Sequence, residues 1–474
     1  MCGCNVSGAD SIRLGLTEDS DLADTLSTFD IRYRGRRFAT GANWQRTFGA
    51  TGVGLLGLSY TRASVDQRIK DLVRDGVQDP GTPVADQIAS GAEVFRENSI
   101  ESEAAAKYDL TLNVTAIGKL QAGVAGRRMR YAYDAASPFG ADGPYFVEPD
   151  QYPFALAEQR TTTQAAGYVQ ASRALGTRLG VTAGVRADRF GYLAAWRTVP
   201  RFGASLKVTP SVTVKGALGR YYQQPFMLFV SAFPENRGVT PFRADHAVAG
   251  VEWLPDASTR VSIEAYAKRY ADYPAARDVP SLSLANIGDT FAIRDVLFPL
   301  VSEGAGTARG VELLAERKPA PGARWFGQAN LSVSKTRHAG RDGVFRPGSF
   351  DYPIVANLVG TRLLGERWLA SIRAVYLDGR PLTPIDAAAS ASGRRAIYDL
   401  SRVNAERSPD YFRADLRVDR RFTVSGRDLT VFAGVQNITN RKNFSSFAWD
   451  RRNNSLRTSE QLGVFPILGL DWQF

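Results

Sequence analysis

The sequence contains very few of the residues from which most catalytic and metal sites are built. Its 474 residues include only two histidines, His246 and His338, and two cysteines, Cys2 and Cys4. Two histidines leave almost no possibility of a Ser-His or Cys-His catalytic pair. Two cysteines at the amino end make neither a disulfide framework nor a zinc site. Phosphate-binding, dinucleotide-binding and calcium-binding loop spacings are also missing. We expect no enzyme, no resident metal and no cofactor.

Long apolar runs are missing as well. No run approaches the ~18 residues of a transmembrane helix, and the mean hydropathy is -0.22. A helical membrane protein is thereby excluded, whereas a transmembrane β-barrel is not, because its strands are only half apolar. The first residues, MCGCNVSGADSIRL, contain no basic segment followed by an apolar one, so no secretory signal is visible.

The formal net charge of +11 raises nucleic acid as a partner. The basic residues are dispersed along the chain without a clustered motif, so we expect no nucleic-acid binding. No shift in composition divides the chain into separate units.

Alternation of apolar and polar residues is what the sequence has in abundance. A period of two places the two kinds of side chain on opposite faces of a strand. We count about 17–18 such segments, many of them longer than the ~5–6 residues typical of soluble sheets. In the clearest segment, Phe412, Ala414, Leu416 and Val418 alternate with Arg413, Asp415, Arg417, Asp419 and Arg421.

The connections between these segments are of two kinds. Short turns rich in Pro, Gly, Asp and Ser occur at 115–119, 209–211, 255–258, 318–322 and 425–427. Long connections lie between them at 66–92, 135–155, 223–243, 272–304, 379–408 and 441–460. Strict alternation of short and long connections places all long loops at one end. An outer-membrane barrel has this layout, with short periplasmic turns and long outer loops.

The last residues of the chain alternate in the same way. Leu468, Leu470, Trp472 and Phe474 share one face of the segment 463–474, and the chain ends on the aromatic residue. In a membrane barrel this apolar face meets lipid and its aromatic residues lie at the interface.

Five stretches resemble the barrel half of TonB-dependent outer-membrane receptors. They are RYYQQP at 220–225, the hairpin GVEWLPDASTRVSIEAYAKRYADYP at 250–274, ARGVELLAERK at 308–318, FAGVQNITNRKN at 432–443 and the closing segment 465–474. No single stretch is highly specific, but their order and spacing are. In its general pattern, without further matching motifs, the resemblance covers about the whole chain after Thr25.

The resemblance implies an antiparallel transmembrane β-barrel of 22 strands, preceded by a signal peptide, a TonB box and a plug domain. None of these three is visible before Thr25. We therefore expect residues 1–24 to be an irregular remnant (strand or loop) of a truncated amino end. Residues 25–474 are then about 17–18 of the 22 strands, in a barrel that is incompletely closed.

The resemblance also implies a location in the cell outer membrane, with the long loops extracellular and the carboxy terminus periplasmic. The implied function is active uptake of a scarce nutrient, most often a ferric siderophore or similar chelate, driven by the TonB complex through the plug. Lipid, lipopolysaccharide and the barrel assembly machinery are implied partners, and the apolar face of the closing strand resembles the signal that this machinery recognises. We expect Phe474→Ala to lower membrane insertion more than ligand binding.

Aromatic and basic residues where strands enter the long loops are the best candidates for ligand binding. They would present rings and positive charge to an anionic metal chelate. An interfacial aromatic girdle with arginines on lipopolysaccharide phosphates is the alternative interpretation. The candidates are Arg127, Arg130, Tyr131, Tyr221, Tyr222, Gln223, Gln224 and Phe226.

The charged face formed by Arg413, Asp415, Arg417, Asp419 and Arg421 is expected to be a ladder of ion pairs in the lumen. Carboxylates between arginines have depressed pKa values, so they do not suit acid–base catalysis. Two alternative functions stay open. The chain is a plug-less porin or adhesin barrel, complete as it stands, or a soluble many-stranded binding protein.

Overall fold

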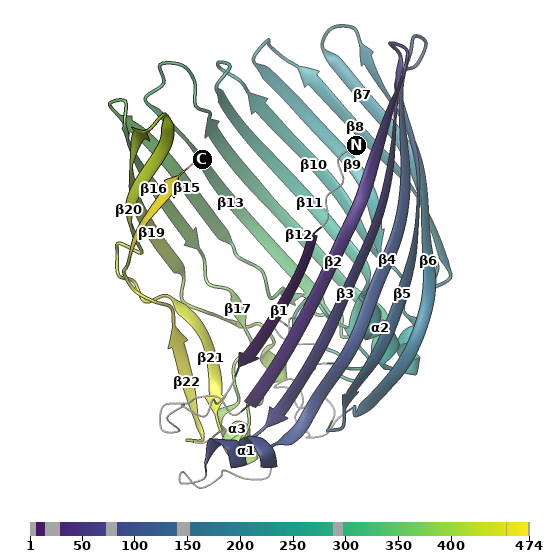
Figure 1. The fold of residues 1–474 in the computed structure, drawn as a ribbon. Coiled ribbons are helices and arrows are strands. Elements are labelled where there is room, and N and C mark those ends of the chain that lie inside the picture. The colour runs from purple at the N-terminus through teal and green to yellow at the C-terminus, as the bar shows by residue number, and fades with distance from the viewer. Residues whose placement is uncertain are drawn as a thin grey trace.

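A single large antiparallel sheet forms the wall of the molecule (Figure 1). The computed structural model describes residues 6–14, 29–72, 83–139, 152–287, 297–451 and 453–472. Within them the sheet has 19 strands, one of which, β14, is only two residues long. The expected all-β architecture is therefore confirmed. The strands in order are β1 (Val6–Leu14), β2 (Phe29–Phe48), β3 (Gly52–Asp71), β4 (Ala92–Val114), β5 (Gly118–Ser137), β6 (Phe154–Leu175), β7 (Leu179–Phe190), β8 (Ala195–Lys207), β9 (Val212–Gln223), β10 (Phe242–Trp253), β11 (Thr259–Ala276), β12 (Leu300–Arg317), β13 (Trp325–Ala339), β14 (Arg346–Pro347), β15 (Ile354–Leu364), β16 (Trp368–Leu377), β19 (Tyr411–Val424), β20 (Arg427–Gln436) and β23 (Phe465–Trp472).

The remaining elements lie in the long connections. Two short hairpins pair β17 with β18 and β21 with β22. Short helices also occur there, and no helix in the described part of the chain is long and apolar enough to cross a membrane. The elements are α1 (Val84–Ser90), α2 (Met227–Ala232), η1 (Pro234–Gly238), β17 (Pro381–Leu382), α3 (Ala387–Gly393), η3 (Leu400–Arg402), β18 (Glu406–Arg407), β21 (Phe444–Asp450) and β22 (Ser455–Glu460).

The sheet curves around a lumen without closing. Each long strand pairs with the next along the chain, from β1 with β2 to β20 with β23. Among the described residues β1 and β23 each have one partner strand, and Figure 1 shows the gap between them. This agrees with the expected incomplete closure. Two free edges leave two rows of backbone N–H and C=O groups without a sheet partner.

The period of two separates an apolar outer face from a polar inner one. Val124, Leu218 and Leu468 project outward and are 64%, 59% and 82% exposed. On the inner face, Lys107 pairs with Asp109 and Lys215 pairs with Glu252. In water such an apolar exterior would be unfavourable, whereas the hydrocarbon of a bilayer covers it.

The two ends of the sheet carry different connections. At one end, which we call the turn end, consecutive strands are joined by two to seven residues, as between β4 and β5 or between β19 and β20. The other end, which we call the loop end, carries the long connections with their short helices and hairpins (Figure 1). One connection departs from the expected strict alternation. Residues 191–194 join β7 to β8 in a short turn at the loop end, and that short connection was not predicted.

Some strands also run further than expected. β3 continues to Asp71 and β11 to Ala276, inside segments that were expected to be loops. A strand can continue through polar residues when a neighbouring strand completes its backbone hydrogen bonds. Here β4 does this for β3, and β12 does it for β11. The strands β2 to β6 consequently have 20–23 residues, about twice the ~9–11 that a tilted strand needs to span a bilayer.

A hydrophobic core fills the loop end of the lumen. Phe95, Met129 and Tyr133 from the inner faces of β4 and β5 pack in one cluster with Val230 of α2 and Phe298 before β12. Phe95 and Val230 are completely buried. The described parts of the long loops thus pack against the tall strands.

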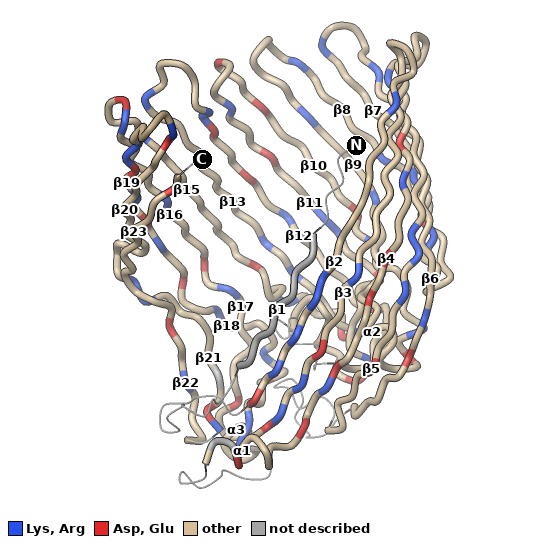
Figure 2. The backbone as a smooth tube through the Cα atoms, viewed as in Figure 1, with Lys and Arg blue, Asp and Glu red and all other residues tan. Residues whose placement is uncertain are grey.

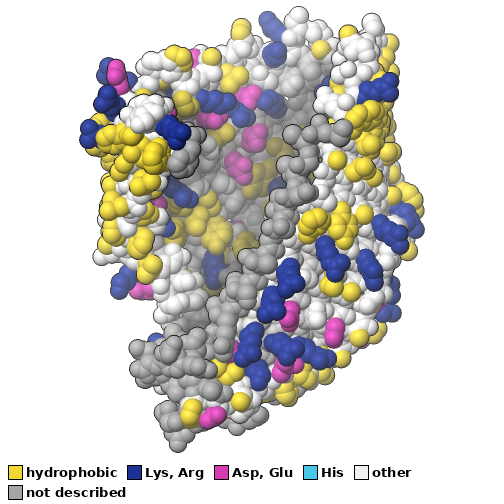
Figure 3. All heavy atoms as spheres, in the orientation of Figure 1, with side chains coloured by type: hydrophobic (Ala, Val, Ile, Leu, Met, Phe, Trp, Pro, Cys, Tyr) yellow, Lys and Arg dark blue, Asp and Glu magenta, His cyan; other side chains and the backbone are white. Residues whose placement is uncertain are grey.

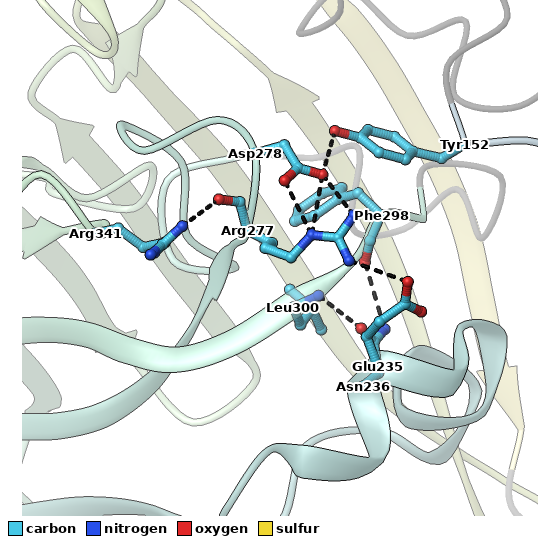
Figure 4. A network of polar contacts seen from close by, with 8 residues as sticks. All are labelled: Tyr152, Glu235, Asn236, Arg277, Asp278, Phe298, Leu300 and Arg341. Atoms are coloured by element: carbon cyan, nitrogen blue, oxygen red, sulfur yellow. Dashed lines mark hydrogen bonds and ion pairs between the residues drawn. The ribbon is translucent and has the colours of Figure 1, made fainter.

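A polar network ties two of these loops together (Figure 4). The buried side chain of Asn236 donates to the carbonyl oxygen of Phe229 at 2.6 Å and accepts from the backbone N–H of Leu300 at 2.6 Å. Nearby, Arg277 forms ion pairs with Glu235 at 3.0 Å and with Asp278 at 2.9 Å. Hydrogen bonds from Arg277 hold the pKa of Asp278 below its usual range.

One ion pair links the two sides of the sheet at the loop end. Arg451, between β21 and β22, contacts the carboxylate of Asp71 at the end of β3. Both side chains are largely buried, and Arg451 also donates to the carbonyl oxygen of Arg394 at 3.0 Å. We call this contact the clasp. It joins the end of β3 to the β21–β22 hairpin at the loop end.

The first residues contribute one strand. β1 pairs with β2 along its whole length, with Val6 opposite Ala39 and Leu14 opposite Ile31. The other residues of the expected 1–24 remnant, both cysteines included, lie outside the described part of the chain. Gln473 and Phe474 also lie outside it.

Candidate ligand-binding site

A cavity of about 1060 Å³ opens in the lumen near the loop end. The two clusters predicted from the sequence meet in its wall. Arg127 and Tyr131 come from β5, whereas Tyr221, Tyr222 and Gln223 come from the end of β9, and Gln224 and Phe226 follow directly. Seven of the eight candidates therefore line one space, which we call the charged chamber.

Arg130 is the exception. It lies three residues from Arg127 and one from Tyr131, so the alternation of β5 turns it to the opposite, outer face. There it shares a surface pocket with Arg128 and Tyr60 and donates to the side chain of Gln159 at 3.3 Å. The structure removes Arg130 from the chamber and places it beside the apolar exterior.

Charged side chains of both signs line the chamber. Arg186 and Asp188 form a paired contact with an N–O distance of 2.7 Å, and Arg127 lies 3.6 Å from Glu103. Figure 2 shows that basic and acidic residues recur along the strands that supply them. Of these four residues only Arg127 was among the predicted candidates. Arg186 and Asp188 alternate with the apolar Val185 and Ala187, and this period of two is the signal that could have found them.

Aromatic rings and amides complete the wall. The guanidinium of Arg201 lies over the ring of Tyr221 at 4.7 Å, and its Nε is buried without a hydrogen-bond partner among the described residues. Gln164 of β6 donates to the side chain of Gln224 at 3.1 Å. This contact fixes the segment after β9 against the opposite wall. The chamber thus has a preformed polar lining.

The chemistry of the chamber is that of binding. Arginine guanidinium groups, tyrosine hydroxyls and amides supply hydrogen-bond donors for an anionic ligand. In the described part of the chain no three His, Cys, Asp or Glu side chains are grouped so that they could hold a metal ion.

The predicted ladder lies on the inner face of β19, away from the chamber. Arg413 pairs with Asp415 at 2.7 Å and Arg417 with Asp419 at 2.5 Å, while Arg421 continues the same face toward the turn end. Asp415 also accepts the backbone N–H of Asn437 at 2.8 Å. Fully paired carboxylates of this kind support the interpretation as a structural ladder.

The closing strand β23 presents its apolar side outward. Leu468, Leu470 and Trp472 are 82%, 69% and 44% exposed and lie on the lipid-facing side of the sheet. The fourth residue of the predicted signal, Phe474, lies outside the described residues.

Solved structures with a similar fold include receptors for metal chelates. The pyoverdine receptor FpvA of Pseudomonas aeruginosa PAO1 matches with a TM-score of 0.67 and 12% identity, over 94% of this chain and 62% of that one. The ferric-catecholate import receptor Fiu of E. coli K12 matches with a TM-score of 0.63 and 10% identity, over 94% and 65%. The ferric yersiniabactin receptor FyuA of Yersinia pestis matches with a TM-score of 0.62 and 13% identity, over 93% and 61%.

These likenesses establish the fold, because the identities are low. The chain spans less than two thirds of the length of each of these three receptors. A comparison with curated proteins gives no match. The family model "TonB dependent receptor-like, beta-barrel" matches residues 6–438. The chain therefore belongs to the β-barrel family of TonB-dependent outer-membrane receptors.

Proposed function

We propose that this chain is the barrel part of a receptor for active uptake of a scarce nutrient, a ferric siderophore or a similar anionic chelate. The observation that carries the proposal is the convergence of β5 and β9. Arg127 and Tyr131 meet Tyr221 and Tyr222 in one chamber near the loop end. Energy from the TonB complex, delivered through a plug domain, belongs to the same proposal for the whole protein.

Titration of ferric chelates into the purified chain tests this function. We expect a ferric tris-catecholate to bind the protein in lipid nanodiscs. Arg127→Gln should weaken binding about tenfold or more, since a hydrogen bond to a charged group contributes ~1.5–3 kcal/mol. Arg130→Gln is the matched control, because the same strand carries it on the opposite face. Absence of binding, or equal losses in the two variants, would reject the proposal.

The proposed orientation places the loop end outside the cell and the turn end in the periplasm. Leu462 at the loop end and Ala257 at the turn end are both exposed. In a variant with Cys2 and Cys4 replaced by serine, Leu462→Cys should react with an impermeant maleimide in intact cells. Ala257→Cys should react only after the outer membrane is permeabilised, and the reverse pattern would invert the orientation.

Lipid with phosphate groups is the partner that we propose for the outer face at the loop end. Phe38 and Tyr60 make a ring contact at 6.2 Å on that face, and the exposed Arg36, Arg62 and Arg130 lie beyond them. Figure 3 shows basic side chains gathered over this part of the wall, next to hydrophobic ones. Arginines just beyond an apolar band suit the headgroup zone of a leaflet. Phosphorylated glycolipid that copurifies with the protein should decrease in Arg62→Gln/Arg130→Gln.

The closing strand is the proposed contact for the barrel assembly machinery. The exposed Leu470 and Trp472 present an apolar edge near the end of the chain. We expect Leu470→Asp to lower the fraction of protein that becomes heat-modifiable on gels. An unchanged fraction would argue against a role in assembly.

A further inference from the structure

A second cavity, of about 630 Å³, adjoins the charged chamber. The two spaces share the segment 223–226, whose residues line both of them. The second space has a different chemistry. The described residues that line it include no Asp, Glu, Lys or Arg, whereas aromatic rings recur around it. We call it the apolar chamber.

Aromatic side chains from three strands form a continuous wall of this chamber. The rings of Tyr270 and His338 are stacked, with centroids 5.6 Å apart and planes 30° apart. Tyr273 lies 5.4 Å from the same imidazole and 5.0 Å from Phe242. Offset and tilted contacts of this kind present ring faces and edges that suit another flat ring.

Two phenyl rings at the chamber are exposed. Phe226 is 60% exposed and Phe350 is 64% exposed, although both line a cavity within the lumen. Neither ring lies on the lipid-facing side of a sheet strand, because both belong to connections. Apolar surface left open inside a binding cavity gains free energy when a ligand covers it.

His338 adds one polar group to this wall. Its ring is only 7% exposed, and Nδ1 has no hydrogen-bond partner among the described residues. Two glycines make room for the ring. A Cβ at Gly306 would lie 2.5 Å from Nδ1, and one at Gly348 would lie 2.9 Å from Cδ2. The imidazole of His338 is therefore closely packed and presents a flat ring, and its Nδ1 has no hydrogen-bond partner among the described residues.

The loop that carries Phe350 is fixed by hydrogen bonds. Its neighbour Asp351 accepts from the backbone N–H of Thr336 at 2.6 Å and pairs with Arg407 at 2.5 Å. Asn404 donates to the carbonyl oxygen of Pro347 at 2.8 Å. A preformed wall loses little conformational entropy when a ligand binds.

We propose that the apolar chamber holds a flat, uncharged, ring-bearing arm of the ligand whose anionic metal-binding head lies in the charged chamber. The shared segment 223–226 connects the two spaces, so one molecule reaches both. This inference rests on the proposed uptake function and narrows its substrate class to two-part chelates. The charged chamber then recognises the charge of the metal-binding head, and the apolar chamber recognises the shape of the ring.

A matched pair of chelates tests the inference on the full chain in lipid nanodiscs. One probe is a ferric tris-catecholate, and the other is the same chelate with a naphthalene group on a short linker. The naphthalene-bearing chelate should bind about tenfold more tightly, which is the effect of burying one ring. Its naphthalene emission should shift to shorter wavelength on binding.

Two variants of one connection locate the effect. Phe350→Asp places a charge in the apolar chamber and should reduce the affinity of the naphthalene chelate to that of the plain one. Phe345→Asp is the matched control. Phe345 is 41% exposed in the same connection and does not line the chamber, so both affinities should stay as in the unchanged protein.

Each outcome decides between the proposals. Equal affinities for the two probes, or a gain that survives Phe350→Asp, would overturn the apolar chamber as the arm site and leave the uptake function standing. Failure of both probes to bind would overturn the uptake of chelates and this inference with it. A gain abolished by Phe350→Asp and kept in Phe345→Asp supports both.

Discussion

The loop end and the turn end of the sheet are stabilised in different ways. At the loop end, Phe95, Val230 and Phe298 belong to one buried core, and Asn236 and Arg277 link the loops above it. At the turn end the short connections are held by local hydrogen bonds, for example those that Asp256 accepts from Ser258 and Thr259. Between the two ends the strands meet lipid.

This difference shows that two regions of one chain are stabilised by different physical effects. The loop end buries apolar side chains away from water, as a soluble domain does. The middle of the sheet satisfies its backbone by strand pairing and leaves its apolar side chains to the bilayer. Substitutions should therefore have effects that depend on where they lie along a strand, and the following variants measure this.

The largest effect is expected in the core of the loop end. Phe95 is completely buried and contacts Phe154 with ring centroids 6.5 Å apart. Phe95→Ala should lower the free energy of unfolding by about 3–5 kcal/mol, measured by urea unfolding in vesicles, and should make the long loops sensitive to protease. Val124→Ala, on the lipid face of the next strand, is the control. Equal losses would show that the two ends are not distinct.

A charge in the lipid-facing band should have the next largest effect. Leu468 on β23 and Leu462 just before it are both 82% exposed, so burial in the protein does not distinguish them. Leu468→Arg should cost about 2–4 kcal/mol in the bilayer, whereas Leu462→Arg, at the loop end, should cost about 0–1 kcal/mol. Similar values for the two variants would place the membrane boundary elsewhere.

Breaking the clasp should have an intermediate effect. Arg451→Met removes a charged partner from the buried Asp71, which keeps other contacts. We expect a loss of about 1.5–3 kcal/mol. Arg402→Met is the control, because the ion pair of Arg402 with Glu406 is half exposed on both sides and exposed pairs contribute ~0–1 kcal/mol. A larger loss in the control would refute the clasp.

The smallest effect is expected at the turn end, and it depends on pH. Hydrogen bonds from Ser258 and Thr259 lower the pKa of Asp256 to about 2. A carboxylate with a depressed pKa adds stability above its unfolded pKa near 3.8, and this contribution is lost as the pH falls to about 2. Asp256→Ala should therefore lower the melting temperature slightly at pH 7, and the difference should vanish by pH 2. A constant difference would mean that the charge is irrelevant.

Much of the wall could be predicted from the sequence, because a strand with two different environments leaves a period of two. The same period also predicts the orientation of Arg130. It is adjacent to Tyr131 on one strand, so the two side chains point to opposite faces of the sheet. The loop end could not be predicted in this way. Leu282 and Phe298 enter the core from connections without periodicity, and the meeting of Arg127 with Tyr221 depends on how the sheet curves over three intervening strands.

The free edges of β1 and β23 have a mechanical consequence. In a closed cylinder, strand number and shear fix the diameter. Here the two edges are unpaired among the described residues, and Arg451 with Asp71 joins the ring at one rim only. Within the described residues, pairing of the two edge strands therefore does not set the distance between the two sides of the sheet. At the loop end this role falls to the hydrophobic core, in which side chains of the wall pack against those of the long loops beside the binding chambers.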